Sequence, residues 1–476
     1  MAAPSSQLLY KPYSHGKQSS CPDPPTLVAK LDDYIIGQDA AKRAIAVAVR
    51  DRWCRLQVPD EQLRKEIAPS NILLMGPSGC GKTELARRMA DFIGAPFVKV
   101  VATRFTEVGF VGDNTNTMIE ELADQAYLDE SKRMRLEIEE EAADAAADEI
   151  VRAYITASHS REPIAKLILQ LRAGALDKEV VDIDEQHVLA FRKARGESSS
   201  GDPQDTGSTS SQSSFPTMYT NRTRNQRPRW FRVPVMAGLE MVRESITSKL
   251  LQTRESTLVD RAKTAAEQRG IIFLDEFDKL IEDADSNDDG GSFKSKRRGV
   301  QKELLSLIEG TSVSTPRLGK VNTDHVLFIC TGAFSFAKPS AIMPELQGRL
   351  QIHTQLKALT REELVRVLSS VRFSLPAQHQ ALLAAEGVAL EFTPCAFDAI
   401  AEAAAAANKA SANTGARRLQ QILGLLLEEI KFNASGLTGQ TVVFDGQRVK
   451  ASLEGTAIGK LMSRELKDGD LKKFII

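Results

Sequence analysis

Residues 76–83 read GPSGCGKT, and this short run decides the fold of the chain. It fits the pattern G-x-x-x-x-G-K-[ST], follows the apolar segment Ile72–Met75 and precedes residues 84–90, whose apolar spacing is helical. In a strand–loop–helix setting, backbone N–H groups surround a di- or triphosphate and the helix N-terminus adds partial positive charge. Lys82 is expected to reach the β- and γ-phosphates, and the Thr83 hydroxyl to ligate Mg²⁺. The run therefore predicts a nucleotide-binding α/β domain.

A second motif predicts what the nucleotide is used for. Four apolar residues, Ile271–Leu274, run into the carboxylates Asp275 and Glu276, which is typical of a buried parallel strand that ends at the active edge of a sheet. Asp275 is expected to hold Mg²⁺, and Glu276 to orient or deprotonate the attacking water. The chain has no Asn-Lys-x-Asp run of the kind with which GTPases read their base. ATP hydrolysis is therefore the favoured reaction.

Composition restricts the other possibilities. A chain of 476 residues exceeds one ordinary core, so two or three domains are expected. The formal net charge of −1 gives no overall electrostatic footprint for nucleic acid, and no apolar stretch reaches the length of a membrane span. The five cysteines are scattered without a C-x-x-C pair, which argues against a structural zinc site or disulfide framework and fits a reducing compartment.

Shifts in composition divide the chain into domains. About 190 residues separate the phosphate loop from Asp275, more than the intervening helix–strand units require, so an inserted, mostly helical domain is expected. We predict a disordered extension (1–25), followed by the first part of the ATPase domain (26–112) and a helical insert (113–245) with a Ser-rich loop at 196–229. The second part of the ATPase domain (246–355) and a helical lid domain with an apolar tail (356–476) complete the chain. Within the lid domain, Asp445-Gly446 between two short apolar runs predicts a β-hairpin.

An α/β nucleotide domain followed by a small helical lid resembles the AAA+ ATPases. Residues 326–331 look like the strand that carries the polar sensor of the γ-phosphate, with Thr331 at the sensor position where many relatives have Asn. Arg349 resembles the arginine finger that acts on a neighbouring subunit, and Arg417 the second sensor supplied by the lid domain. A guanidinium suits both positions, because it is always charged and forked for phosphate oxygens.

Within these ATPases the chain resembles the HslU (ClpY) family, the unfoldase subunits of a two-component protease, over nearly its whole length. Residues 33–42 are similar to that family's adenine-side segment, residues 105–112 to its pore loop, with Phe110 where Tyr is usual, and residues 471–476 to its apolar tail. The resemblance implies ATP and Mg²⁺ as cofactors, and it implies site residues for nucleotide binding (Ile36, Gly76, Gly79, Cys80, Gly81, Lys82, Thr83, Glu84, Thr331, Glu345, Arg417), for the substrate pore (Gly109, Phe110, Val111, Gly112) and for partner docking (Leu471, Phe474, Ile475, Ile476).

The resemblance also implies partners and a compartment. A homo-hexameric ring is expected to unfold protein substrates and feed them to an HslV-type protease ring, since the chain shows no protease triad or metal motif of its own. Neither a membrane nor nucleic acid is expected as a partner. The acid-free N-terminus and polar insert favour an organelle of bacterial descent, the mitochondrial matrix, with bacterial cytoplasm as the alternative.

Three other functions compete with this interpretation. A ClpX-like unfoldase normally carries an N-terminal four-cysteine zinc module and a shorter spacing between the phosphate motifs, neither of which is found here. A DNA-directed AAA+ motor would favour a basic appendage, against which the net charge of −1 argues. A nucleotide-gated scaffold without turnover would not need Glu276 and the two arginines at these positions.

Overall fold

The computed structural model describes residues 21–105, 114–159, 161–177, 179–194, 230–281, 291–335, 337–410, 413–454, 456 and 458, without the side chains of 193–194 and 291–297. Within these residues the chain forms two compact units, residues 126–263 and the remainder. The pore residues 109–112, the Ser-rich loop 196–229 and the tail 471–476 lie outside the described residues. No helix of the described part has the length and apolar character needed to cross a membrane.

A parallel sheet forms the centre of the first unit. Its strand order is β2-β5-β8-β1-β9, and every neighbouring pair is parallel. The strands are β1 (Ile72–Met75), β2 (Phe97–Val101), β5 (Ile271–Asp275), β8 (Leu327–Gly332) and β9 (Ile352–Gln355). Strands β5 and β8 are apolar almost throughout because both of their faces are covered. All five carboxyl ends therefore meet at one edge of the sheet.

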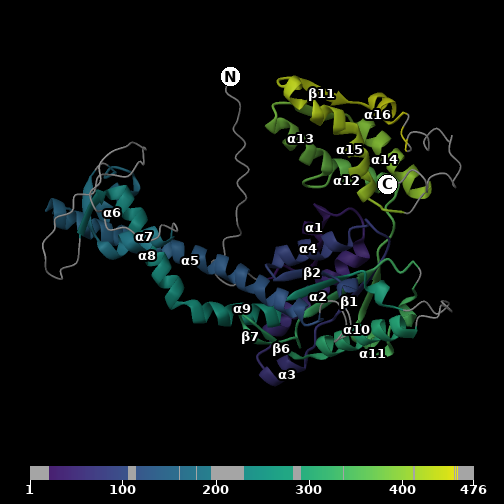
Figure 1. Cartoon of the computed structure of the whole chain (residues 1–476), viewed down its shortest axis with the longest axis horizontal. Helices are drawn as coiled ribbons and strands as arrows, with labels where there is room; N and C mark the ends of the chain where they lie inside the picture. Colours follow the sequence, from purple (N-terminus) through teal and green to yellow (C-terminus); the bar gives the residue numbers. More distant parts are fainter. Residues whose placement is uncertain are drawn as a thin grey trace. The chain divides into compact units, whose positions relative to one another are not determined.

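Helices cover this sheet and complete the ATPase core. Helices α1 (Pro24–Asp32), α2 (Asp39–Leu56) and α4 (Lys82–Ile93) share one buried apolar cluster with β1, β5 and β8, and they lie beside the sheet strands in Figure 1. The remaining elements of the core are α3 (Glu61–Glu66), α10 (Gly291–Glu309), the β6–β7 hairpin (Ser312–Thr315, Gly319–Asn322) and α11 (Pro344–Arg349). The predicted α/β fold with a parallel sheet is confirmed.

The second unit is mostly helical. Its elements are α5 (Thr117–Ser158), α6 (Ile164–Arg172), β3 (Val180–Asp184), α7 (Glu185–Ala194), β4 (Trp230–Pro234), α8 (Val235–Thr253) and α9 (Glu255–Arg269). Strands β3 and β4 pair antiparallel and pack with α5–α8 around a separate apolar cluster. Composition predicts an insert at 113–245, whereas this unit is residues 126–263. Helices α5 and α9 run continuously past its two ends, which composition alone does not reveal.

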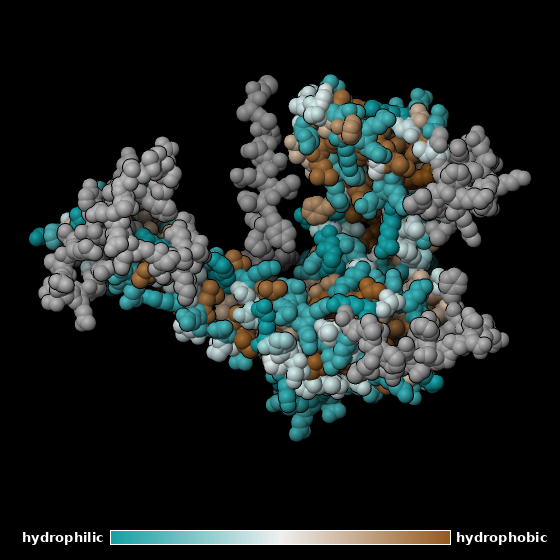
Figure 2. Space-filling view, viewed as in Figure 1, coloured by the Kyte–Doolittle hydropathy of each residue, from teal (hydrophilic) through white to brown (hydrophobic). Residues whose placement is uncertain are grey.

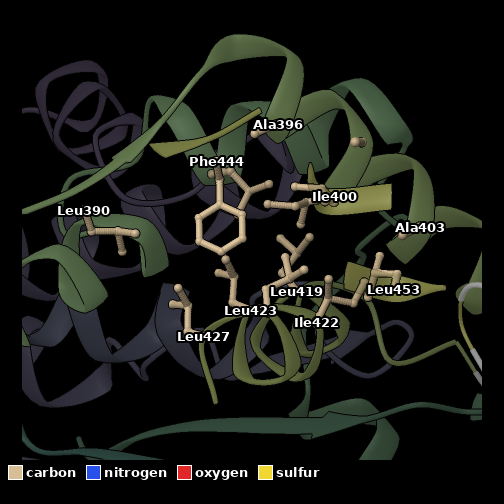
Figure 3. Packing of buried hydrophobic residues seen from close by; sticks show 14 of the residues in the cluster. Leu390, Ala396, Ile400, Ala403, Leu419, Ile422, Leu423, Leu427, Phe444 and Leu453 are labelled. Atoms are coloured by element: carbon tan, nitrogen blue, oxygen red, sulfur yellow. The ribbon is translucent and has the colours of Figure 1, made fainter. Parts of the chain in front are cut away.

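The lid domain, predicted from residue 356 onward, has a buried apolar cluster of its own among the described residues. Helices α12 (Arg361–Ser369), α13 (Leu375–Ala385), α14 (Pro394–Ala410), α15 (Arg417–Phe432) and α16 (Gly446–Leu453) pack with one face of a two-stranded sheet of β10 (Ala389–Phe392) and β11 (Thr441–Phe444). Figure 3 shows the Phe444 ring at the centre of the cluster, between Ile400 of α14 and Leu423 of α15.

The predicted hairpin at Asp445-Gly446 is wrong. Strand β11 pairs with β10, and in parallel, while the second expected strand is part of helix α16. Asp445 is the N-cap of that helix, and its carboxylate accepts a hydrogen bond from the Arg448 N–H at 2.7 Å. Asp stabilises a helix N-terminus as readily as a turn, so the dipeptide did not distinguish the two.

Candidate nucleotide-binding site

A cleft of about 670 Å³ opens where β1, β5 and β8 end, between the ATPase core and the lid domain. The core contributes the phosphate loop and the residues that follow β5 and β8, while the lid domain contributes α12, α13 and the start of α15. Open parallel sheets bind their ligands at this edge. The predicted site residues that line the cleft are Gly79, Gly81, Lys82, Thr83, Glu84, Asp275, Glu276 and Arg417.

The phosphate loop has the backbone that an anion cradle requires. Helix α4 begins at Lys82, directly after Gly81, whose φ of +100° is left-handed. Gly79 has φ +70°, and a Cβ at this position would lie 1.9 Å from the Thr414 carbonyl oxygen of the lid domain. The Lys82 ammonium donates hydrogen bonds to loop carbonyls, including that of Pro77 at 2.9 Å. The ammonium and the first N–H groups of α4 therefore lie at one end of the cleft.

Asp275 is held ionised at the end of β5. Its Oδ1 accepts hydrogen bonds from the Thr331 hydroxyl at 2.9 Å and the Glu276 N–H at 3.1 Å, and its Oδ2 lies 3.1 Å from the Lys99 ammonium. Burial alone would raise the pKa of Asp275, but the bonds from Lys99 and Thr331 outweigh it, and the pKa lies below its ordinary value. Thr331 is fully buried on β8, so its hydroxyl is held in place beside this carboxylate.

The Asp275 carboxylate and the Thr83 hydroxyl fit a magnesium ion. An ionised carboxylate and a hydroxyl are oxygen ligands of the kind Mg²⁺ takes, together with phosphates and water. The described residues contain no group of three or more His, Cys, Asp or Glu that could hold a metal by themselves. A Mg²⁺ bound by Asp275, Thr83 and the phosphates needs no such group.

Glu276 has an unusual backbone. Its φ is +57° and its ψ +31°, the left-handed region that residues other than glycine seldom adopt. The side chain is exposed and lines the cleft. Strain of this kind costs about 1–3 kcal/mol and gathers at functional sites. The turn that follows β5 thus holds Asp275 and Glu276 on the same side of the sheet edge.

The lid domain contacts the phosphate loop directly. Arg417, the first residue of α15, donates a hydrogen bond from Nη1 to the Ser78 hydroxyl at 3.0 Å. The Ala416 N–H donates to the Gly79 carbonyl at 3.1 Å. A guanidinium from the lid domain is therefore positioned over the loop.

Other predicted residues lie outside the cleft of this chain. Arg349 ends α11, where its Nε and Nη2 donate to Glu309 Oε1 at 3.1 and 3.0 Å, and Glu345 lies in the first turn of the same helix. Ile36 lies in the segment between α1 and α2. Cys80 is buried beneath the loop, and burial raises the pKa of its thiol.

Sequence reasoning missed several residues of the site. Tyr34 lines the cleft, and the Arg88 guanidinium stacks 4.1 Å from its ring centre. Lys99 pairs with Asp275 from the neighbouring strand β2. Asp278 also lines the cleft, and its Oδ2 accepts a hydrogen bond from the Phe334 N–H at 3.1 Å. Of these residues, Lys99 was the one that the sequence could have indicated, because it is a single charge in the otherwise apolar strand Phe97–Val101.

Comparison with known proteins assigns the family. Residues 72–227 match the model of the ATPase family associated with various cellular activities (AAA), and residues 231–368 that of the AAA domain (Cdc48 subfamily). The ATP-dependent protease ATPase subunit HslU of Rhodospirillum centenum is 41% identical over 453 residues, which cover 95% of this chain and 99% of that protein. The chain belongs to the HslU family. The protein of the same name from Hyphomonas neptunium is 42% identical, covering 95% of this chain and 99% of its own length.

Membership of the HslU family confirms the predicted AAA+ fold and an ATPase activity. It also argues against the ClpX-like and DNA-directed alternatives. A further HslU, from Caulobacter sp., is 42% identical and covers 93% of this chain and 98% of its own length. The predicted location in the mitochondrial matrix is wrong, because all three relatives come from bacteria and point to a bacterial cytoplasm. An acid-free N-terminus was too weak a signal for the compartment.

Proposed function

We propose that this ATPase is a ring-forming protein unfoldase that threads substrates into a separate HslV-type protease ring. The observation that carries the proposal is the cleft between ATPase core and lid domain, in which the phosphate loop, Asp275, Glu276 and Arg417 face one nucleotide site. A nucleotide bound there touches both domains, so its hydrolysis changes the position that the lid domain prefers. The names of the relatives supply the proteolytic context.

The proposed chemistry assigns one role to each residue. The α4 N-terminus and Lys82 bind the β- and γ-phosphates, and Thr83 and Asp275 hold Mg²⁺, which neutralises charge between these phosphates when it is bound. Glu276 orients the attacking water and accepts its proton. Thr331, the proposed sensor residue, donates its hydroxyl hydrogen bond to Asp275 and so acts on the nucleotide through this carboxylate.

We propose that the ring completes this site. Arg349 and Glu345 lie outside the cleft of their own chain, so they act on the nucleotide of a neighbouring subunit in a homo-hexamer. Exposed apolar side chains on the lid domain support an oligomer: Phe432 is 88%, Leu382 60% and Leu425 47% exposed. Apolar residues gather on the face of the lid domain seen in Figure 2 (brown).

The pore role of Phe110 is tested by its truncation. Phe110→Ala is expected to spare basal ATP hydrolysis and to slow translocation of a folded substrate at least tenfold, because an apolar ring grips the polypeptide but touches no phosphate. Phe110→Tyr, the matched control, is expected to be nearly neutral. A core role would instead lower stability by about 3–5 kcal/mol in the alanine variant. Melting temperature, ATPase rate and single-turnover unfolding are the measurements, and an alanine variant that is stable and unfolds at the parental rate contradicts the pore role.

The partnership is tested with the apolar tail. Deleting residues 471–476 is expected to leave ATP hydrolysis and ring assembly within about twofold of the parental values and to abolish stimulation of the protease ring. Each buried apolar side chain contributes about 1.5–3 kcal/mol, and six tails act together through avidity. The measurement is ATP-dependent degradation of an unfolded protein with and without the protease ring. If the truncated protein stimulates the protease fully, the docking role fails. If the intact protein gives no stimulation, the proposed function fails.

A further inference from the structure

Gln38 has a strained backbone whose cause is not local. It precedes helix α2 with φ +63° and ψ +32°, and Gly37 before it has φ +65°. Glycine or asparagine at this position would adopt the left-handed conformation at lower cost. The glutamine side chain does not cap its own helix. The reason for a glutamine here must therefore lie elsewhere in the fold.

The Gln38 carboxamide forms a two-way bridge to the connection that leads into the lid domain. Its Nε2 donates to the Lys357 carbonyl at 2.9 Å, and its Oε1 accepts from the Lys357 N–H at 3.0 Å. Lys357 lies between the end of β9 and the start of α12. Only a carboxamide offers a donor and an acceptor side by side in this geometry.

The segment that ends at Gln38, residues 33–38, is fixed on two further sides. The buried Lys42 ammonium, 1% exposed, donates to the Ile35 carbonyl at 2.7 Å and ties the segment to the ATPase core. The Arg372 N–H donates to the Asp33 carbonyl at 2.8 Å and ties it to the lid domain. The segment reaches the cleft through Tyr34, whose side chain lines it.

We propose that Gln38 is a positioning residue for ATP binding, which fastens segment 33–38 to the connection 356–360 so that the Tyr34 side of the cleft and the lid domain keep one arrangement. The proposal rests on the proposed function in one respect, the binding of ATP in this cleft. Without the bridge, the phosphate loop and Arg417 are unchanged, but segment 33–38 is held to the lid domain less firmly, by the Arg372–Asp33 bond. ATP then binds less tightly, while bound ATP reaches the same catalytic residues.

The variants separate the side chain from the backbone. Gln38→Ala removes the bridge, and Gln38→Gly removes it and also suits the left-handed backbone. Gln38→Asn suits that backbone too, but its carboxamide is one methylene too short to reach Lys357. Gln38→Glu keeps the acceptor and loses the donor. Gln380→Ala is the matched control, because it removes a glutamine–carbonyl bond, to Leu390 at 3.1 Å, that lies wholly within the lid domain.

Two readouts are expected to change together. In the nucleotide-free protein, hydrogen exchange at the Lys357 and Arg372 amides should quicken about tenfold in the Ala, Asn and Gly variants. The Kd for a fluorescent ATP analogue should rise about tenfold, or about 1.4 kcal/mol, and about threefold for Gln38→Glu. The kcat at saturating ATP should stay within twofold of the parental value, and Gln380→Ala should match the parent throughout.

The opposing outcomes are distinct. Parental Kd and parental Arg372 exchange in Gln38→Asn and Gln38→Gly would overturn the proposal, since only the backbone would then matter. A fall in kcat with an unchanged Kd would also overturn it. If Lys82→Ala leaves ATP affinity unchanged, the proposed ATP site fails, but hydrogen exchange in the free protein still decides whether Gln38 holds the segment. Failure of the unfoldase function alters neither readout.

Discussion

Glu276→Gln is expected to bind ATP and Mg²⁺ normally and to hydrolyse ATP about 10²–10⁴-fold more slowly. The amide keeps the size of the side chain but cannot accept the proton of the attacking water. The phosphate cradle, Lys82 and the Asp275 carboxylate with its bonds to Thr331 and Lys99 remain in place. Nucleotide affinity by titration and single-turnover hydrolysis measure the two steps separately.

The comparison with Lys82→Ala sharpens this result. That variant removes the ammonium at the α4 N-terminus and is expected to weaken nucleotide binding itself, and with it ring assembly. Because Glu276 is exposed and its backbone conformation suits Gln equally, the melting temperature of Glu276→Gln should match the parent. Turnover at the parental rate would remove Glu276 from its catalytic role.

The sequence predicted those parts of the site in which local chain geometry sets the chemistry. The phosphate loop needs only one strand, one turn and one helix, all within residues 72–93. Asp275 and Glu276 follow an apolar strand at once, so their position at the sheet edge could be inferred. In each case the residues that act together are neighbours in sequence.

Contacts between distant residues could not be predicted in this way. The Lys99–Asp275 pair depends on β2 lying next to β5 at the sheet edge, and strand order is not written in either strand. The bridge from Gln38 to Lys357 joins residues 319 positions apart. The hairpin predicted at Asp445-Gly446 was wrong for a different reason, since an Asp at a strand end caps a helix or opens a turn with equal ease.

The second large effect on ATP hydrolysis is expected when Arg349 is replaced. Arg349→Ala is expected to slow hydrolysis about 10³–10⁵-fold while ATP affinity stays within about twofold, because an arginine finger acts mainly on charge that develops in the transition state. Among the described residues of its own chain, the Arg349 guanidinium pairs only with Glu309 on the exposed surface, and such pairs contribute about 0–1 kcal/mol to stability. Arg361→Ala, which removes another exposed arginine–carboxylate pair, with Asp398 at 3.6 Å, is the matched control and should keep parental activity.

Mixed rings test whether Arg349 acts on a neighbour. Subunits carrying Arg349→Ala have an intact Glu276, and subunits carrying Glu276→Gln have an intact Arg349. If the finger acts in trans, a mixed ring contains interfaces where an intact finger meets an intact base, and ATPase activity should return, with a maximum near equal mixing. If the finger acts in cis, every site retains one defect and no ratio restores activity. Mixed assembly, verified by pull-down of one tagged variant with the other, makes an absence of recovery decisive against the trans arrangement.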